Sequence, residues 1–269
     1  MASLEVLYED NHLLVVNKPA GIATMGAEQG PTMHSLAAHY LKTTYRKPGN
    51  AFVGVVSRLD AMTSGVLVLA KTSKAASRLS AQFAERSSDR SEKVYLALVE
   101  GSLIYPDANR PGTNSTDETL PGQEWIDFVR KDDAAHRMRV VNPSSPGAKE
   151  ARLRYHQIGS TENWSLVAVR LISGRKHQIR LQFAHRGHAV LGDRKYGSRL
   201  PFPQGIALHS WRLRIVHPTR RVAMWFRADP PSSWKPLLAQ LPNGCRIQSD
   251  NAMQINVDAL LQIDPEDCK

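Results

Sequence analysis

Short apolar runs separated by turn-forming residues dominate the first third of the chain. Two such runs within residues 5–17 flank a polar tetrad at 9–12, a pattern that predicts a β-hairpin. Residues 18–21 contain a proline and a glycine and should end its second strand, because proline cannot donate to a strand ladder. Apolar runs at 53–56 and 66–70 predict two more buried strands, and the segment between them is mainly polar.

Helical periodicity is confined to a few segments. Residues 32–40 carry apolar or small residues at helical spacing. A second helix is expected after Thr72 or Ser73, either of which can cap its first turn. A third should run from about 176 to 186 and stop at Gly187.

The other ordered segments are expected to be strands in hairpin order, with an irregular insertion at 101–123 that is rich in turn-forming residues. Many strands with few helices predict an α+β fold with a long, mainly antiparallel mixed sheet flanked by helices. We expect one domain over residues 1–245 and an acidic C-terminal tail at 246–269. The remaining strands are predicted at 93–100, 125–130, 137–141, 151–155, 164–172, 208–216 and 221–226.

Positive charge is concentrated in one part of the chain. The net charge is +10, yet residues 170–227 alone hold thirteen Lys or Arg and one acid, which gives +12 there and about −2 elsewhere. A dense basic segment is typical of proteins that bind a polyanion such as nucleic acid. A solvated basic surface without a partner is the alternative.

Composition also restricts the cellular setting. The two cysteines, Cys245 and Cys268, form no CxxC pair, so neither a disulfide framework nor a zinc site is indicated. No apolar run approaches the length that spans a bilayer. We therefore expect a cytoplasmic protein without a membrane segment or bound metal.

The polar loop at residues 57–65 is the first candidate for chemistry, because it lies between two buried strands. An ionised Asp60 in that setting can serve as a nucleophile toward a sugar or a base. A turn aspartate that only caps nearby amides is the alternative.

The sequence of this loop, RLDAMTSG at 58–65, resembles the active-site motif of the RluA-like family of RNA pseudouridine synthases. Five further blocks resemble motifs of the same family, in the same order along the chain. They are NKPAG at 17–21, KVYLALVEG at 93–101, GRKHQIR at 174–180, GDRKYG at 192–197, and the segment with Leu208, His209, Leu213, His217 and Pro218.

The resemblance implies a pseudouridine-synthase-like catalytic domain with a central active-site cleft. Asp60 would attack the target uridine, and Tyr95 would lie against the flipped base and help to remove its C5 proton. Arg180 would pair with Asp60 and keep it ionised, and Arg58 would enter the RNA stack where the uridine leaves. No cofactor would be needed, and the partner would be structured RNA, ribosomal or transfer, bound by a monomer. The residues implied in substrate binding are Arg58, Thr63, Ser64, Gly65, Arg175, His177 and Gln178.

For some of these residues taken singly, a structural role is the simpler alternative to a functional one. Tyr95 could be a core aromatic, Arg180 a surface residue lying over apolar neighbours, and Asp193 only a turn residue. The histidines fit no common zinc spacing. The chain also departs from the family pattern at Ser57, at Ala61-Met62 and at Gln182, positions that bear on substrate contact.

Three functions compete with an isomerase. One is a catalytically silent RNA-binding or RNA-chaperone protein on the same fold, and a second is a hydrolase that releases the base. The third is a basic protein with no role on RNA. Loss of Asp60, Tyr95 or Arg180 would favour the first, and all of them are present.

Overall fold

The computed structural model describes residues 4–27, 29–85, 90–103 and 123–241. The chain divides into two compact units, of which unit 1 comprises Met1–Tyr95 and Gln204–Pro231. Unit 2 comprises Leu96–Pro203 and Ser232–Lys269. The expected acidic tail, and most of the expected insertion at 101–123, lie outside the described residues.

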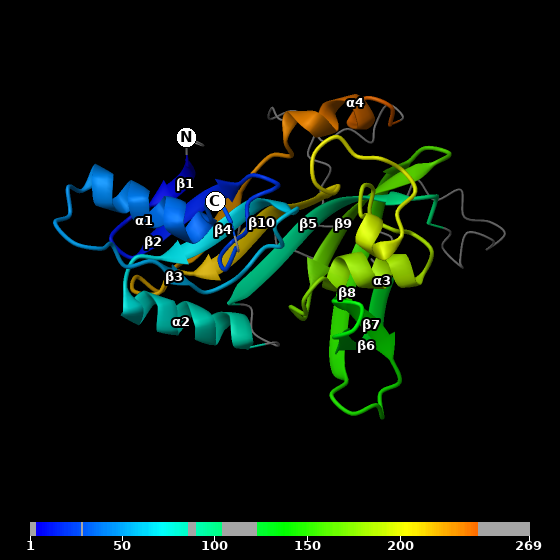
Figure 1. Cartoon of the computed structure of the whole chain (residues 1–269), viewed down its shortest axis with the longest axis horizontal. Helices are drawn as coiled ribbons and strands as arrows, with labels where there is room; N and C mark the ends of the chain where they lie inside the picture. Colours follow the sequence, from blue (N-terminus) through cyan, green and yellow to red (C-terminus); the bar gives the residue numbers. More distant parts are fainter. Residues whose placement is uncertain (1–3, 28, 86–89, 104–122, 242–269) are drawn as a thin grey trace. The chain divides into compact units, whose positions relative to one another are not determined.

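Unit 1 is built on a mixed sheet (Figure 1). Its strands follow the order β1-β2-β4-β10-β5, with β3 paired to β4 and β11 to β10. The β4–β10 pair is parallel, whereas β1–β2, β2–β4, β3–β4 and β10–β11 are antiparallel. The strands are β1 (Glu5–Glu9), β2 (Leu13–Lys18), β3 (Gly54–Val55), β4 (Ser64–Ala70), β10 (Leu208–Val216), β11 (Ala223–Arg227) and β5 (Ser91–Glu100), whose second half belongs to unit 2.

Two capped helices belong to unit 1, α1 (Met33–Thr44) and α2 (Ser73–Ala84). The side chain of Thr72 accepts a hydrogen bond from the backbone of Ala75, so the predicted cap is confirmed. Leu79 of α2 then packs into a core made by strands β2, β4, β10 and β11. Burial of this apolar face orients α2 on the sheet that carries the polar loop.

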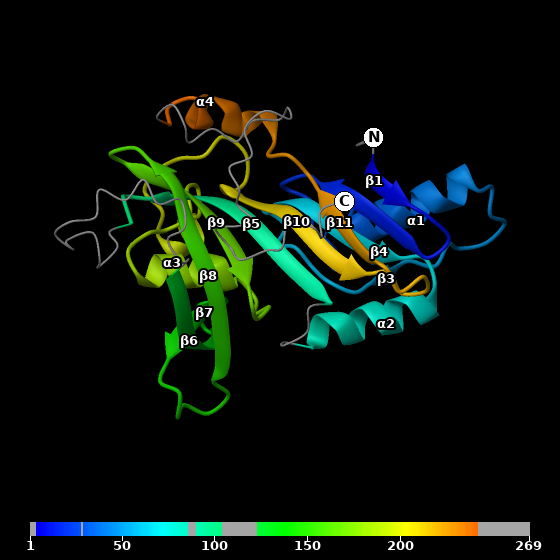
Figure 2. The ribbon, with the colours of Figure 1, turned by 180° about the vertical axis from the view of Figure 1, so that it is seen from behind.

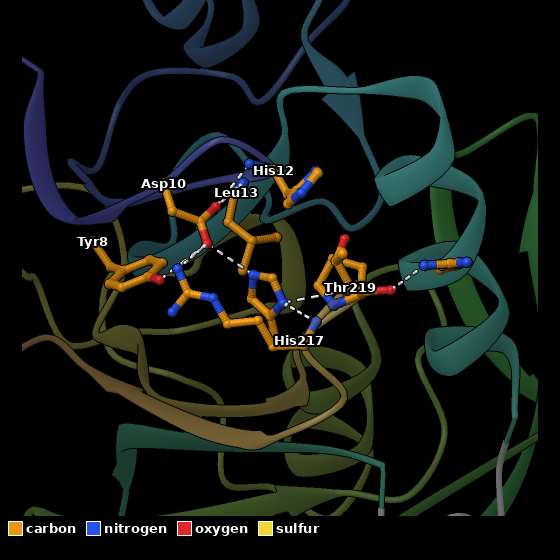
Figure 3. Close-up of polar contacts among 9 residues, drawn as sticks. Tyr8, Asp10, His12, Leu13, His217 and Thr219 are labelled. Atoms are coloured by element: carbon orange, nitrogen blue, oxygen red, sulfur yellow. Dashed lines mark hydrogen bonds and ion pairs between the residues drawn. The ribbon is translucent and has the colours of Figure 1, made fainter.

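A polar cluster joins the turn after β1 to the turn after β10 (Figure 3). Asp10 accepts hydrogen bonds from the backbone of His12 at 2.7 Å and of Leu13 at 2.8 Å, and lies 2.8 Å from Nε2 of His217. His217 Nδ1 accepts the backbone N–H of Arg220, so Nε2 carries the proton and donates to Asp10. Burial acts to raise the pKa of Asp10, but these hydrogen bonds outweigh it and lower the pKa to about 2. The C-terminal His-Pro motif therefore has a structural use here.

Unit 2 contains four antiparallel strands in the order β9-β8-β6-β7, and β5 precedes β9. Helix α3 (Gln178–His185) packs on one face, where Phe183 contacts Trp125 and Tyr155 with ring centroids 4.7 and 5.4 Å apart. The strands are β6 (Gln123–Asp132), β7 (Arg137–Val141), β8 (Lys149–Ser160) and β9 (Trp164–Leu171); short helices are η2 (Arg194–Tyr196), η3 (Ser232–Trp234) and α4 (Lys235–Leu238).

The predicted α+β class, with a large mainly antiparallel mixed sheet and few helices, is confirmed. Among the residues that the structure describes, no helix is both long and apolar enough to cross a membrane.

Candidate active site

The candidate nucleophile lies in a turn that is tied to the N-terminal part of unit 1. The backbone N–H of Thr63 donates to the carbonyl of Asp60 at 3.0 Å and closes the turn directly before β4. On its other side, buried Leu59 exchanges two hydrogen bonds with the hydroxyl of Thr24, at 2.8 and 3.1 Å. Gly21 N–H donates to the carbonyl of Ala61 at 2.9 Å. The loop is therefore held rigidly on both sides of Asp60.

A buried lysine completes this support. Lys18 has no exposed surface, and its ammonium donates to the carbonyls of Pro19, Ile22 and Ala61 at 2.8, 2.6 and 2.9 Å. Burial lowers the pKa of Lys18 to about 8, while the negative charge of Asp60 acts in the opposite direction. A cation thus lies close to Asp60 and binds the next peptide group along the loop.

Lys18 is a functional candidate that the sequence interpretation missed, since residues 18–19 were expected only to bend the chain. A signal was available, because Lys18 follows closely on the apolar run at 13–16, and a buried lysine rarely lacks a partner. The strand pattern alone did not reveal which groups would receive its three protons.

Tyr95 also belongs to unit 1 and lies within electrostatic range of Asp60. The residue is buried, with 8% of its surface exposed, and its side chain shares a hydrogen bond with Ser210. Burial raises the pKa of the Tyr95 hydroxyl above its usual value, and the charge of Asp60 adds to the rise. The hydroxyl is therefore protonated at neutral pH.

Ser64 is joined to a buried histidine on the neighbouring strand. Its hydroxyl lies 2.8 Å from Nδ1 of His209, whose Nε2 lies 2.8 Å from the carbonyl of Ala228. The carbonyl can only accept, so Nε2 carries the proton and Nδ1 accepts from Ser64. Burial lowers the pKa of His209 to about 4, so the ring is neutral at neutral pH. Ser64 is thereby fixed within the sheet.

We expect His209 to make the protein sensitive to acid. Its pKa of about 4 is below its usual value of 6.5, so its contribution to stability is complete above pH 6.5 and is lost as the pH falls toward 4. The loss should approach about 3 kcal/mol, whereas His209→Gln should flatten the curve in this window. Thermal unfolding of both proteins between pH 4 and 7 measures how the stability of each depends on pH. Parallel curves for the two would contradict the assignment, since the other groups with lowered pKa values, such as His156 and Glu9, titrate alike in both proteins.

Gly65 allows β4 to approach β10 closely. Its φ is +110°, and a Cβ atom there would lie 2.2 Å from the carbonyl oxygen of Ser210. The parallel register pairs Gly65 with Ser210 and Ser64 with His209. Only glycine can adopt this backbone angle and fit the short distance between the two strands, so the fold itself requires glycine at this position of the motif.

Gly65→Ala should destabilise unit 1 by about 2–4 kcal/mol, because backbone strain and overpacking each cost roughly 1–3 kcal/mol. The midpoint of urea unfolding reports the change. Gly174→Ala is the matched control, since no atom lies within 4 Å of a Cβ there and its φ is not positive. Equal midpoints for the two variants would refute the close approach.

Arg180 is buried in unit 2 and forms a two-pronged ion pair with Asp193. Its Nε and one terminal nitrogen lie 2.6 and 2.8 Å from the two carboxylate oxygens, and both side chains are almost fully buried. The alternative of a surface arginine is therefore wrong, and Asp193 is more than a turn residue. The expected pairing of Arg180 with Asp60 remains a prediction, because the two residues belong to different units.

Side-chain hydrogen bonds, both within the segment and to β8 and Tyr196, hold the basic segment before α3. The Gln178 side-chain oxygen accepts hydrogen bonds from Ser173 and from the backbone of Arg175, both at 2.9 Å. His177 adopts a left-handed conformation with φ of 54°, and its Nδ1 lies 2.9 Å from the hydroxyl of Tyr196. Gln178 is buried and orders this loop, whereas contact of these residues with substrate remains a prediction.

The remaining candidates differ in exposure. Arg58 is exposed beside Asp60, as a residue that enters RNA must be, whereas Thr63 is buried. Of the departures from the family pattern, Met62 is 42% exposed, and Gln182 is buried with its amide 2.7 Å from Asp127. Met62 can therefore touch a bound molecule, and Gln182 serves the packing of α3.

Within the described ranges, no group of three or more His, Cys, Asp or Glu has an arrangement that could hold a metal ion.

Comparison with known proteins identifies the family. The model of the RNA pseudouridylate synthase family matches residues 12–185. The chain is 34% identical over 251 residues to ribosomal large subunit pseudouridine synthase D of Zymomonas mobilis, covering 88% of this chain and 73% of that protein. It is 30% identical over 248 residues to tRNA pseudouridine synthase C of Yersinia pestis, covering 88% and 90%.

Solved structures share the fold. Human RNA pseudouridylate synthase domain containing 1 superposes with a TM-score of 0.66 at 24% identity, covering 97% of this chain and 96% of that one. Human RNA pseudouridylate synthase domain containing 4 gives a TM-score of 0.65 at 22% identity, covering 88% and 94%. The family match and the two bacterial relatives establish membership: the chain belongs to the family of RNA pseudouridylate synthases, whose members are isomerases.

Proposed function

We propose that this protein isomerises specific uridines of ribosomal or transfer RNA to pseudouridine, with Asp60 as nucleophile and the target base flipped out of its stack. The class of RNA is proposed from two relatives, which are named for the ribosomal large subunit and for tRNA. The observation that carries the proposal is the rigid turn at Asp60, with Lys18 and Tyr95 close enough to interact with its charge.

The reaction requires the bond between the ribose and N1 to break and a bond between the ribose and C5 to form. The C5 hydrogen leaves as a proton, and N1 gains one. A carboxylate at Asp60 can form the transient covalent bond that separates these steps. The Lys18 ammonium holds the turn beside this carboxylate through its hydrogen bond to the carbonyl of Ala61.

Flipping gives this carboxylate access to a base that is otherwise stacked. Extrusion costs about a few kcal/mol, which contacts to the flipped base and to the vacated space must offset. Tyr95 supplies an aromatic surface for the pyrimidine, and exposed Arg58 supplies a planar guanidinium that can stack in the vacancy.

Tritium release tests this proposal. Unmodified ribosomal and transfer RNA, labelled with tritium at uridine C5, is incubated with the purified protein. We expect tritium to enter water from at least one of these RNAs. Tight binding to both without any release would favour the non-catalytic RNA-binding alternative.

A further inference from the structure

One face of the sheet in unit 2 is rich in arginine. Asp127 binds α3 through Gln182 at 2.7 Å, and Val129 packs with Leu181 of the same helix. Side chains alternate along a strand, so the even-numbered residues of β6 point to the face away from α3. Figure 2 shows β8 in front of α3 from this side.

The strand register extends this face across β7, β8 and β9. Arg130 of β6 pairs with Arg139 of β7, and Ile126 pairs with Arg152 of β8. Six residues, which we call the arginine face, share this side of the sheet: Arg130, Arg137, Arg139, Arg152, Arg154 and Arg170.

Charge on this face is unbalanced. Among the described residues, the same register places three acids there, Glu124, Asp132 and Glu150, against six arginines, which leaves a net charge of +3. Glu124 binds Arg152 at 2.5 Å, whereas Asp132 approaches Arg139 only to 4.0 Å. Arg130 and Arg139 are directly opposite each other, an arrangement that destabilises a sheet unless an anion lies between or above them.

The positively charged side chains on this face are all of one chemical type. The strands contain two lysines, Lys131 and Lys149, and both occupy odd positions that belong to the other face. Every cation on the arginine face is a guanidinium, the group that binds phosphate through two parallel hydrogen bonds. Ile126, which is 50% exposed, and partly buried Phe128 lie between the arginines and add an apolar surface.

We propose that the arginine face, which belongs to unit 2, binds the phosphate backbone of RNA, whereas the turn at Asp60 belongs to unit 1. The occupant follows from charge complementarity: a sheet of guanidinium groups with a surplus of positive charge fits a polyanion. The inference relies on the proposed function only for the identity of that polyanion as RNA.

Paired variants of the full chain test this inference. Arg137 and Arg139 are both exposed, so Arg137→Gln with Arg139→Gln removes two charges, and the corresponding lysine pair keeps them. Lys42→Gln with Lys47→Gln removes the same charge from exposed positions of unit 1. Fluorescence anisotropy with labelled tRNA and an rRNA fragment, across a KCl series, gives the dissociation constant and its salt dependence.

The glutamine pair should bind RNA about tenfold more weakly near physiological salt, and its salt slope should fall by roughly 1.5. The lysine pair should keep the wild-type slope and lose part of the affinity, because it lacks the planar fork. The unit 1 control should remain within about twofold of wild type. If the glutamine pair loses stability, the lysine pair still tests the inference, because it keeps both charges and removes only the guanidinium groups.

Equal weakening by the glutamine pair and the unit 1 control would overturn the inference. Tighter RNA binding by the glutamine pair would also overturn it. That result would mean that the arginines bind the acidic segment 249–269 of this chain and not RNA. RNA binding can be measured without catalytic turnover. Failure of the isomerase proposal can therefore be told apart from failure of the arginine-face proposal. Absent tritium release with arginine-dependent binding would refute the isomerase alone, whereas normal release with unchanged binding would refute the arginine face alone.

Discussion

Asp60→Asn is expected to lower kcat for pseudouridine formation by about 10⁴-fold or more, the scale seen when a residue that acts directly on the substrate is removed. Asparagine has nearly the same shape but cannot supply a carboxylate. RNA affinity should stay within about twofold, because the substitution leaves in place the hydrogen bonds that Thr63 and Thr24 make to the backbone of the turn.

Asp133→Asn is the matched control, because Asp133 is an exposed carboxylate of the β6–β7 turn. Single-turnover tritium release and filter binding, performed on both variants, separate chemistry from affinity. An Asp60→Asn protein that kept more than about a tenth of wild-type kcat would remove the nucleophile from the account.

Lys18→Met should reduce kcat by about 100-fold with a smaller change in KM, since a catalytic group displaced by about 1 Å can cost that much. Methionine fills a similar volume but leaves the carbonyls of Pro19, Ile22 and Ala61 without the ammonium that now binds them. The Asp60 turn would then lose both its anchor and a positive charge that interacts with Asp60.

The pH profile distinguishes this positioning role from a purely structural one. The pKa of Lys18 is about 8, so its charged form is present below pH 8 and is lost as the pH rises through that value. We expect wild-type kcat to decline across this range, and Lys18→Met to lack the decline. Lys42→Met, at an exposed site in the last turn of α1, should retain the wild-type profile. An unchanged profile in Lys18→Met would contradict the role.

Local elements of this fold could be predicted because adjacent residues determine them. The hairpin at the N-terminus, the Thr72 cap and the polar turn at Asp60 each follow from a short continuous run of residues. The parallel pairing of β4 with β10 could not be predicted in this way, because its register pairs residues such as Gly65 and Ser210 that are far apart in sequence.

The candidate site residues divide in the same way, into those that a local motif predicts and those that depend on residues distant in sequence. Asp60 and Tyr95 could be nominated from motifs, and the structure brings both within electrostatic range of each other in unit 1. The use of Lys18 depends on three carbonyls contributed by two separate segments, and the Arg180–Asp193 pair depends on the turn after α3. The arginine face depends on the register of four strands. None of these arrangements is encoded in a local pattern.

Product analysis tests the central claim most directly. Unmodified ribosomal or transfer RNA is incubated with the wild-type protein and digested to nucleosides, and pseudouridine, uridine and free uracil are quantified. The account predicts pseudouridine in the same molar amount as the tritium released from C5, and no free uracil. Free uracil without pseudouridine would identify a hydrolase, and unchanged uridine despite tight RNA binding would identify a binding protein; either result would contradict the account.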